Sequence, residues 1–312
     1  MEKRNQTQVS EFILVGFSGQ PDQQRLLFGL FLAVYSVSVL GNLLIILAVR
    51  SDPRLHTPMY FFLVHLSFVD ICLTSTTVPR MLENLWAGGK SIPFAGCLAQ
   101  MYFFLSFVNT DGFLLAAMAY DRFLAICRPL RYAAAMGPRL CTLLVAGPWL
   151  VTHSNALVQT LMMARLSFCV GTVIPHFFCE FAPLLQLACS DTHFNERLAL
   201  AAAVLLGFTP AGCILASYAR IVSVVLRVPS ARGKRRAFST CGSHLVVVTL
   251  FYGTGIGVYL CPAAAYPSGN GPMASLVYAV VTPTLNPFLY SLRNGDMKGA
   301  LRKVICGRFS HH

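Results

Sequence analysis

Seven long apolar stretches follow one another along the chain, separated by short polar segments. They are Leu26–Val49, Pro58–Pro79, Ile92–Tyr120, Leu140–Met163, Leu198–Ala219, Leu245–Cys261 and Met273–Leu292. About 20 consecutive apolar residues in a helix cross the roughly 30 Å hydrocarbon core of a bilayer. The pattern therefore predicts an all-α membrane protein, a bundle of seven transmembrane helices.

The connections between the stretches are mostly short, and no repeat or low-complexity tract interrupts them. We expect a single domain over residues 1–312, with an N-terminal tail over 1–25, a helix bundle over 26–292, and a tail over 293–312 that forms a short amphipathic helix. The start of the chain is too polar for a cleavable signal peptide, so Leu26–Val49 is expected to act as an uncleaved anchor. The segment from about Ala164 to Arg197 is an unusually long loop.

The third stretch shows the clearest helical face, because its inward positions alternate steps of four and three residues. These positions are Cys97, Met101, Phe104, Val108, Asp111, Leu115, Met118 and Arg122. The outer half of this face is apolar. Pro210, Pro283 and Pro287 fall inside other stretches, where each removes a backbone donor and kinks the helix. The kinks are either hinges or static packing features.

Composition agrees with a lipid environment, since only 12% of residues are charged, against roughly 25% in soluble domains. Of the 24 Lys and Arg residues, 17 lie on the side of the loops after the first, third and fifth stretches and of the C-terminal tail. By the positive-inside rule this side is cytoplasmic, and the N-terminus is extracellular. Asn5 then starts a glycosylation sequon on the outer side.

The net charge of +12 and the basic run 231–236 also occur in nucleic-acid-binding proteins. This run lies in a short loop between two apolar stretches, so membrane lipid headgroups are the expected partner and nucleic acid is not. Four cysteines face outward: Cys97, Cys169, Cys179 and Cys189. In an oxidising compartment they can form two disulfides, in any of three pairings.

Two other classes of protein fit a seven-helix pattern. A transporter or channel would use intramembrane acids, but only two acids lie within the stretches and the second half does not repeat the first. An intramembrane enzyme is not expected, because no HExxH, GxSxG or metal-ligand spacing occurs in the sequence.

Eight short motifs follow one another along the chain. They are Gly41-Asn, Leu55-His-Thr-Pro-Met-Tyr-Phe-Phe-Leu, Leu66-Ser-Phe-Val-Asp, Met118-Ala-Tyr-Asp-Arg-Phe-Leu-Ala-Ile-Cys, Ser217-Tyr, Ala237-Phe-Ser-Thr-Cys-Gly-Ser-His, Phe251-Tyr-Gly-Thr, and Pro283-Thr-Leu-Asn-Pro-Phe-Leu-Tyr-Ser-Leu-Arg-Asn. In this order they resemble the vertebrate olfactory receptors of the tetrapod-type class, in the rhodopsin-like G-protein-coupled receptor superfamily. The resemblance extends from Glu11 to about Lys303. Phe123 and Glu180 depart from the family's usual Tyr and Asp, and the loss of the hydroxyl at Phe123 bears on coupling strength.

The resemblance implies an odorant receptor, not an enzyme, in a multi-pass plasma membrane location that is expected to be ciliary. Small, mostly apolar volatile molecules would bind inside the bundle and activate a stimulatory heterotrimeric G protein, raising cyclic AMP. The expected ligand contacts are Phe104, Leu105, Val108, Asn109, Ala202, Leu206, Tyr252, Gly255, Tyr259, Leu276 and Ala279. The alternative is that these side chains are only helix-helix core.

The resemblance also assigns a switch at the cytoplasmic end. Asp121 and Arg122 would pair in the resting receptor, and the freed Arg122 would meet the G protein. Tyr218 and Tyr290 would be its later partners, with His244 as an inactive-state brace. Asn286 and Pro287 would form a hinge. A snorkelling Arg122 without a switching role is the alternative.

Two further assignments depend on the resemblance. Cys97 would pair with Cys179, which matches the family's loop cysteine, and Cys169 would then pair with Cys189. Asp70 and Asp111 both lie roughly 20 Å below the outer face at 1.5 Å per residue, so they should meet. The two carboxylates would share a sodium ion with Asn42 and Asn286, or they would share a proton. No other cofactor is expected.

Overall fold

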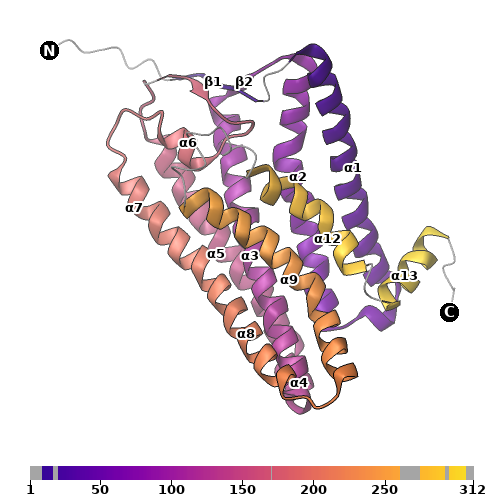
Figure 1. The fold of residues 1–312 in the computed structure, drawn as a ribbon. Helices are drawn as coiled ribbons and strands as arrows, with labels where there is room; N and C mark the ends of the chain where they lie inside the picture. The colour runs from indigo at the N-terminus through magenta and orange to yellow at the C-terminus, as the bar shows by residue number, and fades with distance from the viewer. Residues whose placement is uncertain (1–8, 17–19, 170, 261–274, 292–294, 307–312) are drawn as a thin grey trace, which may run out of the picture.

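The computed structural model describes residues 9–16, 20–169, 171–260, 275–291 and 295–306, without the side chains of 235–240, 256–260 and 291. Its helices form an elongated bundle (Figure 1). Five described helices or continuous helical segments are long and apolar enough to cross a membrane: α1 (Pro21–Ser51), α2 (Pro58–Ala87), α3 (Phe94–Cys127), α5 (Pro138–Ala164) and His193–Leu226.

The segment His193–Leu226 consists of α7 (His193–Ala202), the π-helical turn η2 (Ala203–Phe208) and α8 (Thr209–Leu226). Two further crossings complete the predicted seven. They are α9 (Ala231–Leu260), and the π-helical turn η3 (Val277–Val281) followed by α12 (Thr282–Ser291). Helix α3 contacts α2, α5, α8 and α9 and thus forms the centre of the bundle.

The crossing helices are longer than the apolar stretches, so the predicted bounds were wrong at several ends. The bundle begins at Pro21 and not at residue 26. Helix α2 passes through Pro79 and ends only at Gly88, whose φ of 63° is left-handed. Helix α9 begins at Ala231, 14 residues before the apolar stretch. Hydrophobicity marks the lipid-embedded part, whereas backbone hydrogen bonds continue into the aqueous zones.

Two of the predicted kinks coincide with π-helical turns. The turn η2 ends two residues before Pro210, and η3 ends two residues before Pro283. A proline cannot donate to the carbonyl one turn earlier and its ring crowds that carbonyl, and a wider turn relieves both problems. Hinge motion at these positions stays a prediction.

The inward face predicted for α3 is confirmed. Phe104, Asp111, Leu115 and Met118 are buried, while Val108 and Arg122 are partly buried. One continuous apolar core joins Phe104, Leu115 and Met118 to side chains of α1, α2, α8, α9 and α12.

Short elements lie at both ends of the bundle (Figure 1). At the extracellular end, β1 (Glu11–Leu14) pairs antiparallel with β2 (Ser91–Pro93) and parallel with β3 (Val173–Ile174). The loop after β3 contains α6 (Phe181–Leu185). At the cytoplasmic end lie η1 (Pro53–Leu55), α4 (Pro129–Ala135) and α13 (Gly295–Ile305), the last being the expected amphipathic helix of the tail.

Candidate functional site

The long extracellular loop is fixed over the bundle by two disulfides. They join Cys97 to Cys179 and Cys169 to Cys189, the pairing expected from the sequence. Gln100 of α3 adds a polar contact, because its side-chain oxygen accepts a hydrogen bond of 2.9 Å from the backbone N–H of Cys179. The loop therefore covers the outer end of α3.

The α3 residues expected to contact a ligand lie directly beneath this loop. Phe104 is fully buried, and its ring centroid lies 4.7 Å from that of Phe178 in the loop. Leu105 and Val108 are partly buried. Asn109 donates a hydrogen bond of 2.7 Å to the carbonyl of Leu105, so its amide nitrogen already has a partner within its own helix.

The other predicted ligand contacts lie on the helices around α3. Leu206, Leu276 and Ala279 are buried, and Ala202 and Gly255 are partly buried. The hydroxyl of Tyr252 donates a hydrogen bond of 3.3 Å to the backbone carbonyl of Gly112 in α3. The side chain of Tyr259 lies outside the described residues.

Sequence reasoning missed a buried polar network that joins the loop to the seventh crossing. The Glu180 carboxylate is 1% exposed and accepts hydrogen bonds of 3.0 Å from Tyr278 and 3.3 Å from Ser275. His176 Nε2 lies 3.3 Å from the same carboxylate. Burial lowers the pKa of His176, and Glu180 opposes this effect. The available sequence signal for this network is the acid that directly follows Cys179, but on its own it indicates only a departure from the family's usual Asp.

The two intramembrane acids belong to a polar core at the predicted depth. Asp70 accepts a hydrogen bond of 2.8 Å from Asn286, and Asp111 lies near enough to interact with it electrostatically. The side-chain amide of Asn42 donates a hydrogen bond of 3.0 Å to the carbonyl of Ser38 and one of 3.1 Å to the carbonyl of Pro283. These contacts join α1, α2, α3 and α12 at one level.

Several oxygen atoms of this core are buried without a hydrogen-bond partner among the described residues. They belong to Asp70, both oxygens of Asp111, Asn42, Asn286, Ser38 and Ser67. Oxygen donors of this kind suit a hard cation. The residues present therefore fit the sodium ion expected from the sequence, and they equally allow a shared proton.

At the cytoplasmic end of α3, the expected pairing of Asp121 with Arg122 is not observed. Asp121 instead accepts a hydrogen bond of 2.7 Å from Tyr132 of α4. Within the described residues, Arg122 makes no ion pair and one of its terminal nitrogens is buried without a partner. Neighbouring side chains on a helix diverge by about 100°, so an adjacent Asp and Arg do not readily face each other.

His244 connects three helices just above Arg122. Its Nε2 lies 3.0 Å from the carbonyl of Leu115 in α3, so this nitrogen donates. Its Nδ1 then accepts the hydrogen bond of 2.7 Å from Tyr218 of α8. Tyr290, the other expected partner of Arg122, has a buried hydroxyl without a partner in the described part of the chain.

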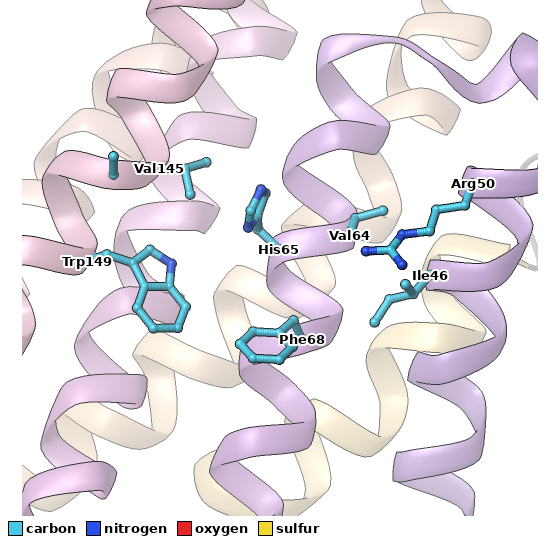
Figure 2. A pocket seen from close by; sticks show the side chains of 8 residues that line it. Ile46, Arg50, Val64, His65, Phe68, Val145 and Trp149 are labelled. Atoms are coloured by element: carbon cyan, nitrogen blue, oxygen red, sulfur yellow. The ribbon is translucent and has the colours of Figure 1, made fainter.

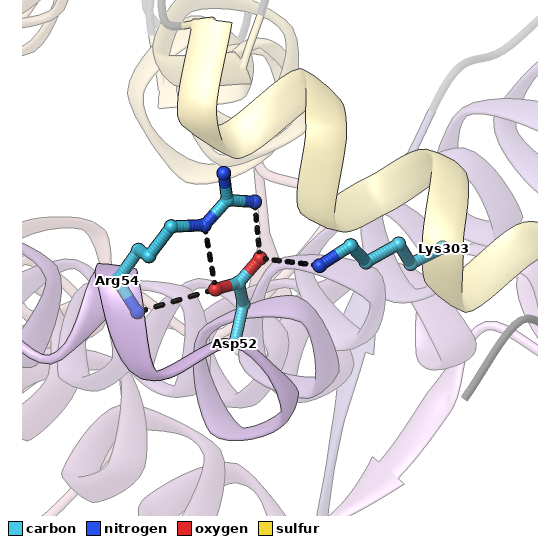
Figure 3. A network of polar contacts seen from close by, with 3 residues as sticks. All are labelled: Asp52, Arg54 and Lys303. Atoms are coloured by element: carbon cyan, nitrogen blue, oxygen red, sulfur yellow. Dashed lines mark hydrogen bonds and ion pairs between the residues drawn. The ribbon is translucent and has the colours of Figure 1, made fainter. Parts of the chain in front are cut away.

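The tail helix is attached to the first cytoplasmic loop by a second missed network (Figure 3). Asp52 accepts hydrogen bonds of 3.0 and 2.7 Å from the Arg54 guanidinium and lies 3.4 Å from Nζ of Lys303. The hydrogen bonds from Arg54 hold the pKa of Asp52 well below its usual range. Asn5 lies outside the described residues.

Comparison with known proteins identifies the family. The sequence model described as "Olfactory receptor" matches residues 31–308. The rat protein Olfactory receptor 1f45 is 58% identical over 309 residues, covering 99% of both chains. Human Olfactory receptor 1F1 is 57% identical over 305 residues, covering 98% of both chains. With its bundle of crossing helices, this chain therefore belongs to the vertebrate olfactory receptor family, whose members are multi-pass membrane receptors and not enzymes.

Proposed function

We propose that this receptor binds small, mostly apolar volatile molecules beside the outer half of α3 and activates a stimulatory heterotrimeric G protein, raising cyclic AMP. The observation that carries the proposal is the continuity of α3. Phe104 lies under the covering loop near the outer end of α3, and Arg122 lies near its cytoplasmic end. Between them on the same helix, the carbonyl of Leu115 accepts a hydrogen bond from His244.

The ligand contacts are those predicted from the sequence, and their character supports a neutral ligand. Phe104, Leu206, Leu276 and Ala279 offer apolar surface, and Tyr252 offers a hydroxyl. A site of this composition gains affinity from apolar burial and orientation from a few hydrogen bonds. The network around Glu180 holds the covering loop against the seventh crossing.

Activation separates the cytoplasmic ends of α8 and α9 from α3. In this step the hydrogen bonds of His244 to Leu115 and Tyr218 break. The side chains of Tyr218 and Tyr290 then turn toward Arg122, and Arg122 contacts the G protein. Asn286 and Pro287 act as the hinge of the seventh crossing. A ligand shifts this equilibrium only by its difference in affinity for the two states.

In this proposal Asp70 and Asp111 hold a sodium ion in the resting state, with oxygen atoms from Asn42 and Asn286. The unpartnered oxygens of these residues are compatible with a bound cation, and the sodium dependence of agonist potency distinguishes this assignment from a shared proton. We propose further that the receptor resides in the ciliary membrane of olfactory sensory neurons, where the odorant arrives from outside.

The deciding experiment is a panel of volatile compounds applied to cells carrying a cyclic AMP reporter, with and without the stimulatory α subunit. At least one compound should raise cyclic AMP only when both receptor and subunit are present. Arg122→Ala should abolish the response at unchanged surface expression, whereas Arg25→Ala, at the extracellular end of α1, should retain it. Ion flux without any G protein would overturn the proposal in favour of a transporter or channel.

A further inference from the structure

A cavity lies along α2 between α1 and α5, and none of the residues that line it belongs to the proposed odorant site. It has a volume of about 420 Å³, within the range of roughly 300–1,000 Å³ typical of small-molecule sites. His65 and Phe68 project from α2, Trp149 from α5, and Arg50 from α1 (Figure 2). We call this cavity the α1–α2–α5 groove.

The groove lies within the cytoplasmic leaflet. Arg50 is one residue from the end of α1, while Phe68 and Trp149 lie ten and eleven residues after the first residues of α2 and α5. At 1.5 Å per residue, Phe68 and Trp149 lie about 15 Å from the cytoplasmic ends of α2 and α5, whereas Arg50 lies close to the cytoplasmic end of α1. That distance is about half of a roughly 30 Å hydrocarbon core.

The inner part of the groove is suited to a hydrocarbon chain. Phe68 is 47% exposed, and its ring centroid lies 6.1 Å from that of Trp149. Val64 and Ile46 continue the apolar surface toward Arg50. This apolar surface can accommodate the acyl chain of any membrane lipid. Selectivity among lipids must therefore come from the polar end of the groove.

The polar end carries a cation without a partner in the described part of the chain. Arg50 makes no ion pair there, since the nearest acid in the sequence, Asp52, already binds Arg54 and Lys303. The Arg50 guanidinium points toward Val64 of α2 and thus lies over the groove (Figure 2). His65 lines the same cavity, and its imidazole has no hydrogen-bond partner among the described residues.

We propose that the α1–α2–α5 groove binds one anionic glycerophospholipid of the cytoplasmic leaflet, with its phosphate on Arg50 and His65 and an acyl chain along Phe68 and Trp149. A guanidinium makes charge-assisted hydrogen bonds to phosphate oxygens. The cytoplasmic leaflet is the one that carries anionic lipids. A zwitterionic lipid fits the apolar part equally well but lacks the net charge that an unpaired arginine favours.

The full-length receptor is placed in phosphatidylcholine nanodiscs containing a photoreactive phosphatidylserine or a photoreactive phosphatidylcholine at equal concentration. Labelling is mapped by peptide mass spectrometry to the segments around Phe68 and Trp149. Phosphatidylserine should label them about five-fold more, the effect of one basic side chain near an anionic surface. Unlabelled phosphatidylserine should suppress this labelling in the unmodified receptor, and unlabelled phosphatidylcholine should not.

Four variants locate the interaction. Arg50→Gln should reduce phosphatidylserine labelling to the phosphatidylcholine level, and Arg50→Lys should keep most of the preference. Arg220→Gln, which removes a cytoplasmic-side charge on α8 outside the groove, should leave it unchanged. Ala146→Phe should fill the groove and reduce labelling by both lipids. Equal labelling of the unmodified receptor by both lipids, a preference that survives Arg50→Gln, or stronger labelling by a photoreactive sterol would each overturn the proposal.

Discussion

The hydroxyl of Tyr218 lies 2.7 Å from Nδ1 of His244, so the fifth and sixth crossings are joined by a buried hydrogen bond. The same imidazole donates to the carbonyl of Leu115 in α3. Both contacts lie next to the coupling end of the bundle. One neutral side chain therefore holds together three helices that the proposed activation must separate.

Replacing His244 by Phe should raise basal signalling. The substitution removes two hydrogen bonds, each contributing about 0.5–1.5 kcal/mol, while keeping most of the apolar volume. A loss of about 1 kcal/mol from the resting state alone moves the equilibrium about five-fold toward the active state. Basal cyclic AMP should be measured at matched surface expression. Unchanged or lower basal signalling in a well-expressed variant would contradict the brace.

Replacing Asp111 by Asn tests the sodium assignment. In the unmodified receptor, replacing sodium by choline at constant ionic strength should increase agonist potency, because sodium is proposed to stabilise the resting state. In Asp111→Asn, which removes the negative charge and retains one oxygen, potency should no longer depend on sodium. If potency in the unmodified receptor does not respond to sodium, the shared proton is the correct alternative.

Replacing Cys97 by Ser should release the covering loop from α3. Loss of a disulfide that closes a long loop typically costs about 2–5 kcal/mol, so surface expression should fall strongly. Cys306→Ser, at an exposed free cysteine of the tail, is the matched control and should express normally. Non-reducing peptide mapping of the unmodified receptor should recover Cys97 linked to Cys179. A Cys97–Cys169 peptide would contradict the structure.

The loop network should make stability depend on pH through His176. Burial lowers its pKa from an ordinary value of 6.5, so the unfolded chain binds a proton more readily than the folded one. The free energy of unfolding should therefore fall as pH drops below about 6.5, by at most about 1.4 kcal/mol per pH unit for one proton. Thermal unfolding of purified His176→Gln should show a weaker dependence between pH 7.5 and 5.5. An identical slope in both proteins would exclude His176 as the cause.

Replacing Asp52 by Asn should loosen α13 from the first cytoplasmic loop. The pKa of Asp52 is lowered by Arg54, so its stabilising effect is present throughout the neutral range and is lost only as pH falls through the lowered value. The midpoint of thermal unfolding should drop by at most about 2 °C, because roughly 1 kcal/mol shifts it by about 2–4 °C in a domain of 150–250 residues and by less in a longer chain. The difference from the unmodified receptor should stay constant between pH 6 and 8. Asp22→Asn, at the extracellular start of α1, serves as the control.

The sequence by itself determined the crossings, their order and the inward face of α3. Each of these depends on local properties: the length of an apolar stretch needed to cross a bilayer, and the helical period that places Phe104, Asp111 and Arg122 on one side. The helix ends were less well predicted, because α2 and α9 extend beyond the lipid, where hydrophobicity no longer reports on the backbone.

Only the tertiary structure decided the partners of the polar side chains. Nothing local indicates that Asp121 accepts from Tyr132, that Glu180 accepts from Tyr278, or that Asp52 lies near Lys303, 251 residues away in sequence. A buried polar group must find a partner, since leaving it unpaired is costly, but many partners satisfy that requirement. The packing of the helices determines which partner lies within reach, and it is set by the whole chain.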